Sequence, residues 1–170
     1  MLKELIDNRD ILLIACGPSI NNLDHSIFKK NIFVVLLNNS FLKFHGDCLF
    51  FADLRFFENY KNLISKEIKL IIPNTLEKTC KDYNIIHIYN PSKDLYRNNL
   101  NTLLAGYSVV IPAIDFCCKL CNKLYIAGLE MENRSHWDKT NLKTFPGKFQ
   151  VLNKILQLQL YYKDVEFNYV

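Results

Sequence analysis

The stretch Ile11-Leu-Leu-Ile-Ala-Cys-Gly-Pro-Ser19 decides the fold. An apolar run that ends abruptly in Gly-Pro-Ser predicts a buried parallel strand that delivers a tight loop to the edge of a sheet. In that loop Gly17 would let the backbone approach a ligand, Pro18 would stiffen the turn and Ser19 would offer a hydroxyl. Such a loop suits a phosphate or a sugar. It is neither a Walker A loop, which needs Gly-Lys-Ser/Thr, nor a dinucleotide fingerprint, which needs several glycines.

Similar apolar runs recur along the chain. They are apolar throughout rather than alternating, which indicates strands that are buried on both faces. The predicted strands cover residues 11–16, 32–37, 48–52, 69–72, 85–89, 124–127 and 165–170. Predicted helices cover residues 54–66, 76–83, 108–121 and 148–162. This alternation predicts an α/β fold with a Rossmann-like, doubly wound and mostly parallel sheet of six to seven strands, forming a single domain over residues 1–170.

Composition narrows the class of protein. The chain of 170 residues is 49% hydrophobic and has twelve Phe and nine Tyr, which favours an ordered globular domain. The net charge of +4 suits an anionic ligand, but Lys and Arg are scattered, so no nucleic-acid partner is expected. No apolar run reaches the roughly 18 residues of a membrane span, and no signal peptide is seen. We therefore expect a cytoplasmic protein, with peripheral association at the inner face of the membrane left open.

Six cysteines require an interpretation. Cys117, Cys118 and Cys121 form a C-C-x-x-C cluster that superficially suggests a metal or redox site. A zinc site usually has two ligand pairs on turns, whereas this cluster lies in a predicted helix without a second pair. We therefore expect free, buried thiols and no metal site.

Open parallel sheets bind ligands at the carboxyl ends of their strands, so the polar residues just after each strand are the candidates. Asn38 and Asn39 follow one strand and would bind a base, a ribose or a sugar, or else simply form a turn. Asp53 follows the next strand and would bind a ribose hydroxyl or a metal-bound phosphate, or else cap a helix.

A predicted helix start, a further strand end and one loop also carry candidates. Ser108, after Gly106, either binds an anion at a helix start or only caps the helix. Gly128 and Glu130 follow a later strand, where Glu130 is a potential ligand for hydroxyls or a base, or else a solvated loop acid. His136 lies in a polar loop expected over the cleft, and a pKa near neutrality suits it to general acid–base catalysis.

The order of these motifs resembles a known family. The relevant residues are Gly17-Pro18-Ser19, an Asn after the second strand, 51–60 (Phe-Ala-Asp-Leu-Arg-Phe-Phe-Glu-Asn-Tyr), the block 106–131 and a following His. Together they resemble bacterial sialyltransferases that modify lipooligosaccharide (glycosyltransferase family 42-like). They also resemble a related uncharacterised group and archaeal 6-hydroxymethylpterin diphosphokinases. The resemblance covers roughly residues 11 to 137.

The sialyltransferase resemblance implies a Rossmann-like glycosyltransferase whose donor is CMP-sialic acid. It implies that Gly17 and Ser19 lie at the donor phosphate, that Asn38 or Asn39 contacts the donor and that Ser108 with Gly106 forms a donor loop. His136 would take the place of the base that deprotonates the acceptor hydroxyl, and no metal would be needed for the transfer.

Three functions follow as hypotheses. The first is a small glycosyltransferase that transfers a sugar from a nucleotide sugar to a cell-surface glycan, as in lipopolysaccharide biosynthesis, with homo-oligomers left open. The second is a diphosphokinase-like enzyme whose Mg²⁺ would be held by Asp53 and Glu130. The third is a non-catalytic nucleotide-binding module, suggested by Ala105 at the position where the family has an Arg before its donor loop.

Overall fold

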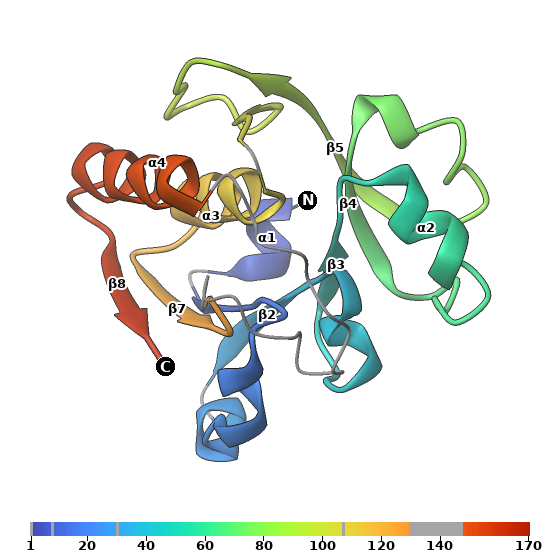
Figure 1. Ribbon diagram of the computed structural model, residues 1–170, viewed down its shortest axis with the longest axis horizontal. Helices are drawn as coiled ribbons and strands as arrows, with labels where there is room; N and C mark the ends of the chain where they lie inside the picture. Colours follow the sequence, from blue (N-terminus) through green and yellow to red (C-terminus); the bar gives the residue numbers. More distant parts are fainter. Residues whose placement is uncertain (1, 8, 30, 107, 130–147) are drawn as a thin grey trace.

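The fold is a single sheet of eight parallel strands with helices on both faces (Figure 1). The computed structural model describes residues 2–7, 9–29, 31–106, 108–129 and 148–170. The strand order is β6-β5-β4-β3-β2-β1-β7-β8, and every neighbouring pair is parallel. The predicted α/β class with a Rossmann-like parallel sheet is therefore confirmed.

The strand count exceeds the predicted six to seven by one. The strands are β1 (Asp10–Ile14), β2 (Ile32–Leu37), β3 (Cys48–Phe50), β4 (Lys69–Pro73), β5 (Ile85–Ser92), β6 (Thr102–Leu104), β7 (Lys123–Ala127) and β8 (Glu166–Tyr169). All seven predicted strands are present, with ends that differ by up to three residues. Strand β6 was not predicted, because three residues between polar turns are too short to show a periodic pattern.

Successive residues of the strands pack into two separate cores. Leu13 and Val35 belong to one hydrophobic cluster, whereas their neighbours Leu12 and Val34 belong to the other. This alternation follows from the two-residue period of a strand, and it explains why the strands read as continuous apolar runs.

The two faces are covered by different kinds of element. The helices α1 (Leu2–Ile6), α3 (Val110–Cys118) and α4 (Lys148–Tyr161) cover one face. The other face carries α2 (Leu54–Tyr60) and four short 3₁₀ helices: η1 (Pro18–Asn22), η2 (His25–Lys29), η3 (Asn38–Leu42) and η4 (Asn74–Leu76).

The helix predictions were partly wrong. Helix α4 has nearly its predicted bounds. Helix α3 covers only Val110–Cys118 of the predicted 108–121, and α2 ends at Tyr60 rather than at residue 66. The helix predicted over residues 76–83 is absent: only η4 and a series of turns occur there. That segment has just two buried apolar residues, Leu76 and Cys80, and its Thr and Asp favour turns over helix.

The winding of the chain reverses beside β1. From β1 the chain adds β2 to β6 on one side, and it then returns to add β7 and β8 on the other side. Right-handed crossovers place the connections of the two halves on opposite faces of the sheet. The boundary between β1 and β7 is therefore the topological switch point of the sheet, the place where ligands bind in folds of this type.

A buried ion pair closes the outer edge of β6. Asp115 and Lys119 of α3 are 3.1 Å apart, with side chains that are 0% and 2% exposed. The Asp115 carboxylate accepts a hydrogen bond from the backbone N–H of Leu104 (2.7 Å), and Lys119 donates to the carbonyl of Thr102 (2.7 Å). One N–H and one carbonyl on this edge of the strand are thus bonded to side chains, and the N–H of Thr102 donates to the backbone carbonyl of Asn99 (3.3 Å).

The same carboxylate also anchors α4. The hydroxyl of Tyr162, just after α4, donates to Asp115 over 2.6 Å and is fully buried. Lys119 donates further to the carbonyl of Asn99 (3.1 Å), and burial lowers its pKa. One buried carboxylate therefore joins β6, α3 and the end of α4.

We predict that replacing Lys119→Met destabilises the fold by about 3–5 kcal/mol, because Asp115 would remain as a buried charge without its cation. Lys123→Met is the matched control, since Lys123 forms an exposed pair with Glu166 (2.9 Å) and such pairs contribute little. Urea denaturation of the two variants measures the difference. Equal losses in the free energy of unfolding would show that the buried pair contributes no more to stability than the exposed pair.

Candidate functional site

The loops after β1 and β7 are joined directly at the switch point. The N–H of Ala15 donates to the carbonyl of Ala127 (2.9 Å), and that of Gly17 donates to the carbonyl of Gly128 (2.8 Å). These bonds extend the pairing of β1 with β7 past the ends of both strands. Two of the predicted site residues, Gly17 and Gly128, are therefore in contact.

Gly17 has an ordinary extended backbone, with φ −70° and ψ 157°. It precedes η1, which begins at Pro18, and Ser19 lies in the first turn of that short helix, half-buried. The N–H of Gly17 is bonded to Gly128, and Ser19 lines the groove described below. The binding role of all three residues remains a prediction.

Gly128, in contrast, requires glycine. Its φ is +71°, and a Cβ atom there would lie 2.5 Å from Cγ2 of Ile20 and 3.0 Å from the carbonyl oxygen of Ala15. Both the left-handed backbone and the close approach of η1 exclude a side chain. The tight contact between the two loops therefore depends on this glycine.

A groove of about 630 Å³ opens beside the switch point. Ser19, Gly128 and Leu129 line it together with residues from β7, α4 and β8. The walls are mostly apolar, with one polar pair in which the side-chain amide of Gln159 donates to the Tyr169 hydroxyl (3.0 Å). A volume of this size, lined by apolar groups with a few polar ones, is typical of small-molecule sites.

The walls of this groove include residues that the sequence did not single out, such as Gln159 and Tyr169. Burial raises the pKa of the Tyr169 hydroxyl. A signal was present in the sequence, because α4 has apolar residues on more than the one stripe that a surface helix needs. Interpreting these additional apolar residues of α4 as the lining of a second surface would have predicted the groove.

Asn38 and Asn39 follow β2 at the same edge of the sheet. Asn38 has a positive φ of 44°, which agrees with the turn interpretation, and its buried side-chain oxygen has no hydrogen-bond partner among the described residues. The amide of Asn39 donates to the hydroxyl of Tyr60 (3.0 Å). The thiol of Cys16 donates to the carbonyl of Leu37 (3.2 Å), which ties the β1 loop to this strand end.

Asp53 is the N-cap of α2. Its carboxylate accepts a hydrogen bond from the N–H of Arg55 (2.8 Å), so the capping interpretation is confirmed. The side chain is also exposed at the carboxyl end of β3. Since adjacent strands lie about 4.8 Å apart, the row of Asp53, Asn38, Gly17 and Gly128 spans roughly 15 Å along the carboxyl edge.

Gly106 and Ser108 line a second, smaller cavity of about 180 Å³ at the carboxyl ends of β3 to β6. The Ser108 hydroxyl accepts a weak bond from the N–H of Val110 (3.4 Å), but Ser108 is not the N-cap of α3, which is Val109. A Cβ on Gly106 would lie 2.7 Å from Ile111, so the loop packs closely on the helix. This cavity lies at the same sheet edge as the switch point but farther along the row of strands.

His136 and Glu130 lie outside the described residues, and their predicted roles remain predictions. The cysteine interpretation can be compared with the described part of the chain. None of the six cysteines forms a disulfide there, and no group of three or more His, Cys, Asp or Glu residues within it is placed to hold a metal ion.

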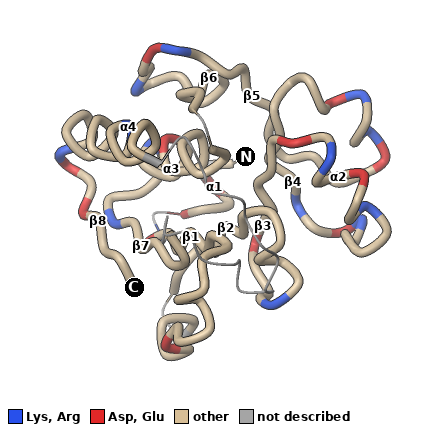
Figure 2. Tube along the Cα trace, in the orientation of Figure 1, with Lys and Arg blue, Asp and Glu red and all other residues tan. Residues whose placement is uncertain are grey.

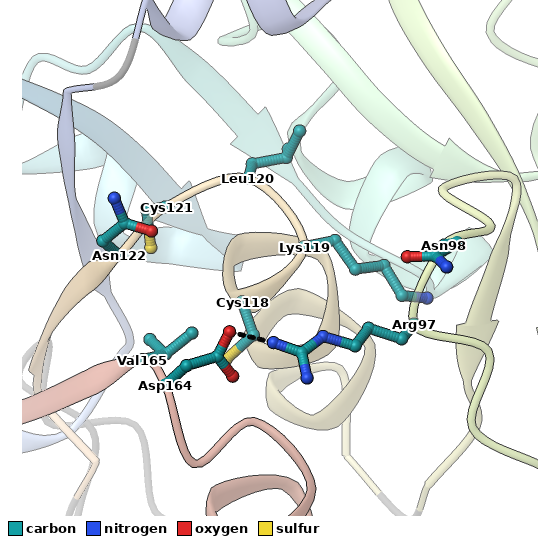
Figure 3. A pocket seen from close by; sticks show the side chains of 9 residues that line it. All are labelled: Arg97, Asn98, Cys118, Lys119, Leu120, Cys121, Asn122, Asp164 and Val165. Atoms are coloured by element: carbon teal, nitrogen blue, oxygen red, sulfur yellow. Dashed lines mark hydrogen bonds and ion pairs between the residues drawn. The ribbon is translucent and has the colours of Figure 1, made fainter.

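A third, polar pocket of about 270 Å³ lies at the opposite, amino edge of the sheet. Figure 3 shows the ion pair of Arg97 with Asp164 there, next to Cys118. Burial raises the pKa of Cys118, and raises that of Cys121 to about 12. Such thiols stay protonated at neutral pH and are poor nucleophiles. This pocket is therefore a weaker candidate than the carboxyl edge.

Lys and Arg are interspersed with Asp and Glu over the molecule, and no continuous basic stripe is visible (Figure 2). One cation does lie near the candidate site: the ammonium of Lys43 donates to the side chain of Asn21 in η1 (2.5 Å). It brings a positive charge to the helix that contains Ser19. Within the described residues, no helix is long and apolar enough to cross a membrane.

The fold and this edge define a doubly wound α/β protein with a candidate ligand site at its switch point. Comparison with known proteins adds no assignment. The chain matches no protein-family model, and the search of curated proteins gives no match either.

We predict that Gly128→Ala destabilises the protein by about 1–3 kcal/mol, because alanine would be forced into a left-handed backbone against Ile20. Gly17→Ala serves as the comparison, since its φ of −70° is open to any residue. Thermal unfolding of both variants gives the difference. A Gly128→Ala variant as stable as the wild type would show that the loops are not held together as described.

We also predict a loss of stability on acidification that depends on His87. Its ring bonds the carbonyl of Leu100 (3.0 Å), and burial lowers its pKa below the ordinary value of 6.5. The unfolded chain therefore takes up a proton first as the pH falls below about 6.5, which favours unfolding until the folded pKa is reached.

His87→Gln keeps a donor but cannot titrate, so its stability should fall less between pH 7 and 5. His45→Gln, in an exposed loop, is the matched control for replacing a histidine by glutamine. Denaturant titrations at several pH values measure the slopes. Parallel slopes for wild type and His87→Gln would contradict the assignment.

Proposed function

We propose that this protein is a small glycosyltransferase that binds a nucleotide-sugar donor, such as CMP-sialic acid, across the carboxyl edge of its sheet. The observation that carries the proposal is the reversal of winding between β1 and β7. It brings the Gly17 and Gly128 loops into contact, and Ser19 lines an adjoining groove. The glycan acceptor and the sialyltransferase-like family are part of the proposal.

Several features of the edge support a nucleotide sugar as the ligand. The row from Asp53 to Gly128 offers hydroxyl, amide and carboxylate groups of the kind that bind ribose and sugar hydroxyls. Lys43 brings a positive charge to η1, near the place proposed for the phosphate. The apolar walls of the groove would cover the less polar part of a donor or acceptor.

In the proposed reaction an acceptor hydroxyl attacks the anomeric carbon of the donor sugar. The new C–O bond forms as the bond between the anomeric carbon and the phosphate oxygen breaks, and the nucleoside monophosphate leaves with that bonding pair. The hydroxyl proton passes to a general base, for which His136 is the proposed residue. The reaction as written balances without a redox cofactor.

We predict that a nucleotide sugar stabilises the protein without Mg²⁺. A ligand at 100 times its Kd adds about 2.7 kcal/mol, which raises the Tm of a domain of this size by several degrees. The measurement is a thermal-shift series with CMP, CMP-sialic acid, UDP- and GDP-sugars and ATP, each with and without Mg²⁺. Stabilisation by ATP only with Mg²⁺ would contradict the proposal in favour of the diphosphokinase-like enzyme.

Ser19→Ala tests the position of the ligand. Losing one hydrogen bond to the ligand should weaken binding about tenfold. Ser65→Ala is the matched control, because Ser65 is an exposed serine in a turn before β4, at the amino edge. Equal affinities for the two variants would place the ligand elsewhere, and binding without turnover of any acceptor would favour the non-catalytic module.

A further inference from the structure

The helix α4 carries two apolar stripes, of which the core buries only one. Val151, Ile155, Leu158 and Tyr162 are buried against the sheet. A second set, here called the outer stripe, consists of Phe149, Leu152, Leu156 and Leu160. Phe149 is 77% exposed and Leu160 is 80% exposed, so the outer stripe faces solvent along the helix. A helix that is apolar on so much of its surface is usually covered on both sides.

The strand next to α4 is also without a second neighbour in the described residues. β8 is the last strand of the sheet and pairs with β7 alone (Figure 1). The N–H groups of Glu166 and Val170 donate toward β7. By the alternation of a parallel strand, the peptide groups of Phe167 and Tyr169 therefore face outward.

The two edges of the sheet are treated differently. At β6 the outward groups of Thr102 and Leu104 are bonded to Lys119 and Asp115. At β8 there is no proline and no lysine, the residues that usually keep an edge strand from pairing. β8 is therefore suited to pairing with another strand.

We propose that α4 and β8 form the interface of a homodimer, with β8 pairing antiparallel to β8 of a second copy around a two-fold axis. Phe167 of one copy would stand opposite Tyr169 of the other, and the outer stripes would pack together. Such an interface is self-complementary, as a two-fold axis requires. A second copy supplies both things that are unpartnered here: a polypeptide edge for β8 and an apolar surface for α4.

The exposed area is sufficient for a stable dimer. The outer stripe, together with Tyr169 (53% exposed) and Val170 (46% exposed), continues from the helix to the strand. With about 150–200 Å² for a large side chain, this surface amounts to roughly 600 Å² per copy. Two copies would bury roughly 1,200 Å², at the lower end of the range for specific interfaces.

Charge also favours a second copy over an acidic or basic partner. α4 has no acidic residue, and its only charged residues are Lys148 and Lys154. In Figure 2 the helix is accordingly almost entirely tan. A surface this uncharged gains little from a charged partner and loses little when it pairs with itself.

The test is the mass of the whole chain in solution, by sedimentation equilibrium over a range of concentrations. We expect a dimer with a Kd of about 1 µM or tighter, as interfaces of standard size show. Leu160→Glu should weaken dimerisation at least tenfold without lowering the Tm of the monomer, because Leu160 contributes little to the core. Leu63→Glu, at a position that is 63% exposed after α2, is the matched control and should leave the dimer intact.

A second variant tests the strand. Tyr169→Pro removes an outward N–H but no bond to β7, so the variant should fold and be monomeric. A wild-type chain that stays monomeric would overturn the proposal, as would a dimer insensitive to both Leu160→Glu and Tyr169→Pro. A monomer that sediments with anionic lipid vesicles through Leu160 would assign the stripe to a membrane surface instead.

Four residues of the proposed interface also line the groove beside Ser19: Leu152, Leu156, Tyr169 and Val170. A dimer would therefore cover part of that groove. Sedimentation without any nucleotide tests the dimer alone, and the thermal-shift series repeated on the Leu160→Glu variant tests the proposed function without the dimer.

Discussion

The buried pair of Asp115 and Lys119 is the interaction on which the arrangement of the second half of the chain depends. Its carboxylate holds β6 through the N–H of Leu104 and holds the end of α4 through Tyr162. A buried charge is tolerated only when it is paired and fully hydrogen-bonded. Because α3 begins just after Gly106 and Ser108, fixing this helix also fixes the loop that forms the smaller cavity. A network far from the switch point thus positions part of the carboxyl edge.

The candidate site itself follows from topology more than from any single side chain. Parallel strands end at one edge, and the reversal between β1 and β7 separates their connections onto opposite faces. That separation leaves room for the groove beside Ser19, while Gly128 lets the two loops touch beneath it. Because neighbouring strands end at this edge, the polar groups that follow them lie in one row. The proposed glycosyltransferase would use such a row, because a nucleotide sugar is long and offers many hydroxyls.

Features that depend on a local sequence pattern could be predicted from the sequence. Features that depend on contacts between distant residues could not. Seven strands were predictable because burial on both faces makes each of them a continuous apolar run, and the strand-end candidates followed from them. Strand β6 was not, since its outer edge is satisfied by Asp115 and Lys119, which are distant in sequence. The prediction of a helix over residues 76–83 was wrong, because two apolar residues spaced by about one helical turn resemble an amphipathic helix. The groove was missed for a related reason: Gln159 and Tyr169 become neighbours only when β8 folds back beside α4.

The difference between the two edges of the sheet supports the interpretation of the outer stripe as part of an interface. A short strand such as β6 exposes peptide groups that cost free energy unless they are bonded, and here the chain supplies the partners itself. At β8 the chain places an unprotected edge next to the apolar side of α4. An exposed leucine alone would need no explanation, because much of any protein surface is apolar. An open strand edge beside a continuous apolar stripe does need an explanation. Water can form hydrogen bonds with the peptide groups of the edge, but it cannot stabilise the exposed apolar stripe. A second strand and helix of the same kind would satisfy both at once.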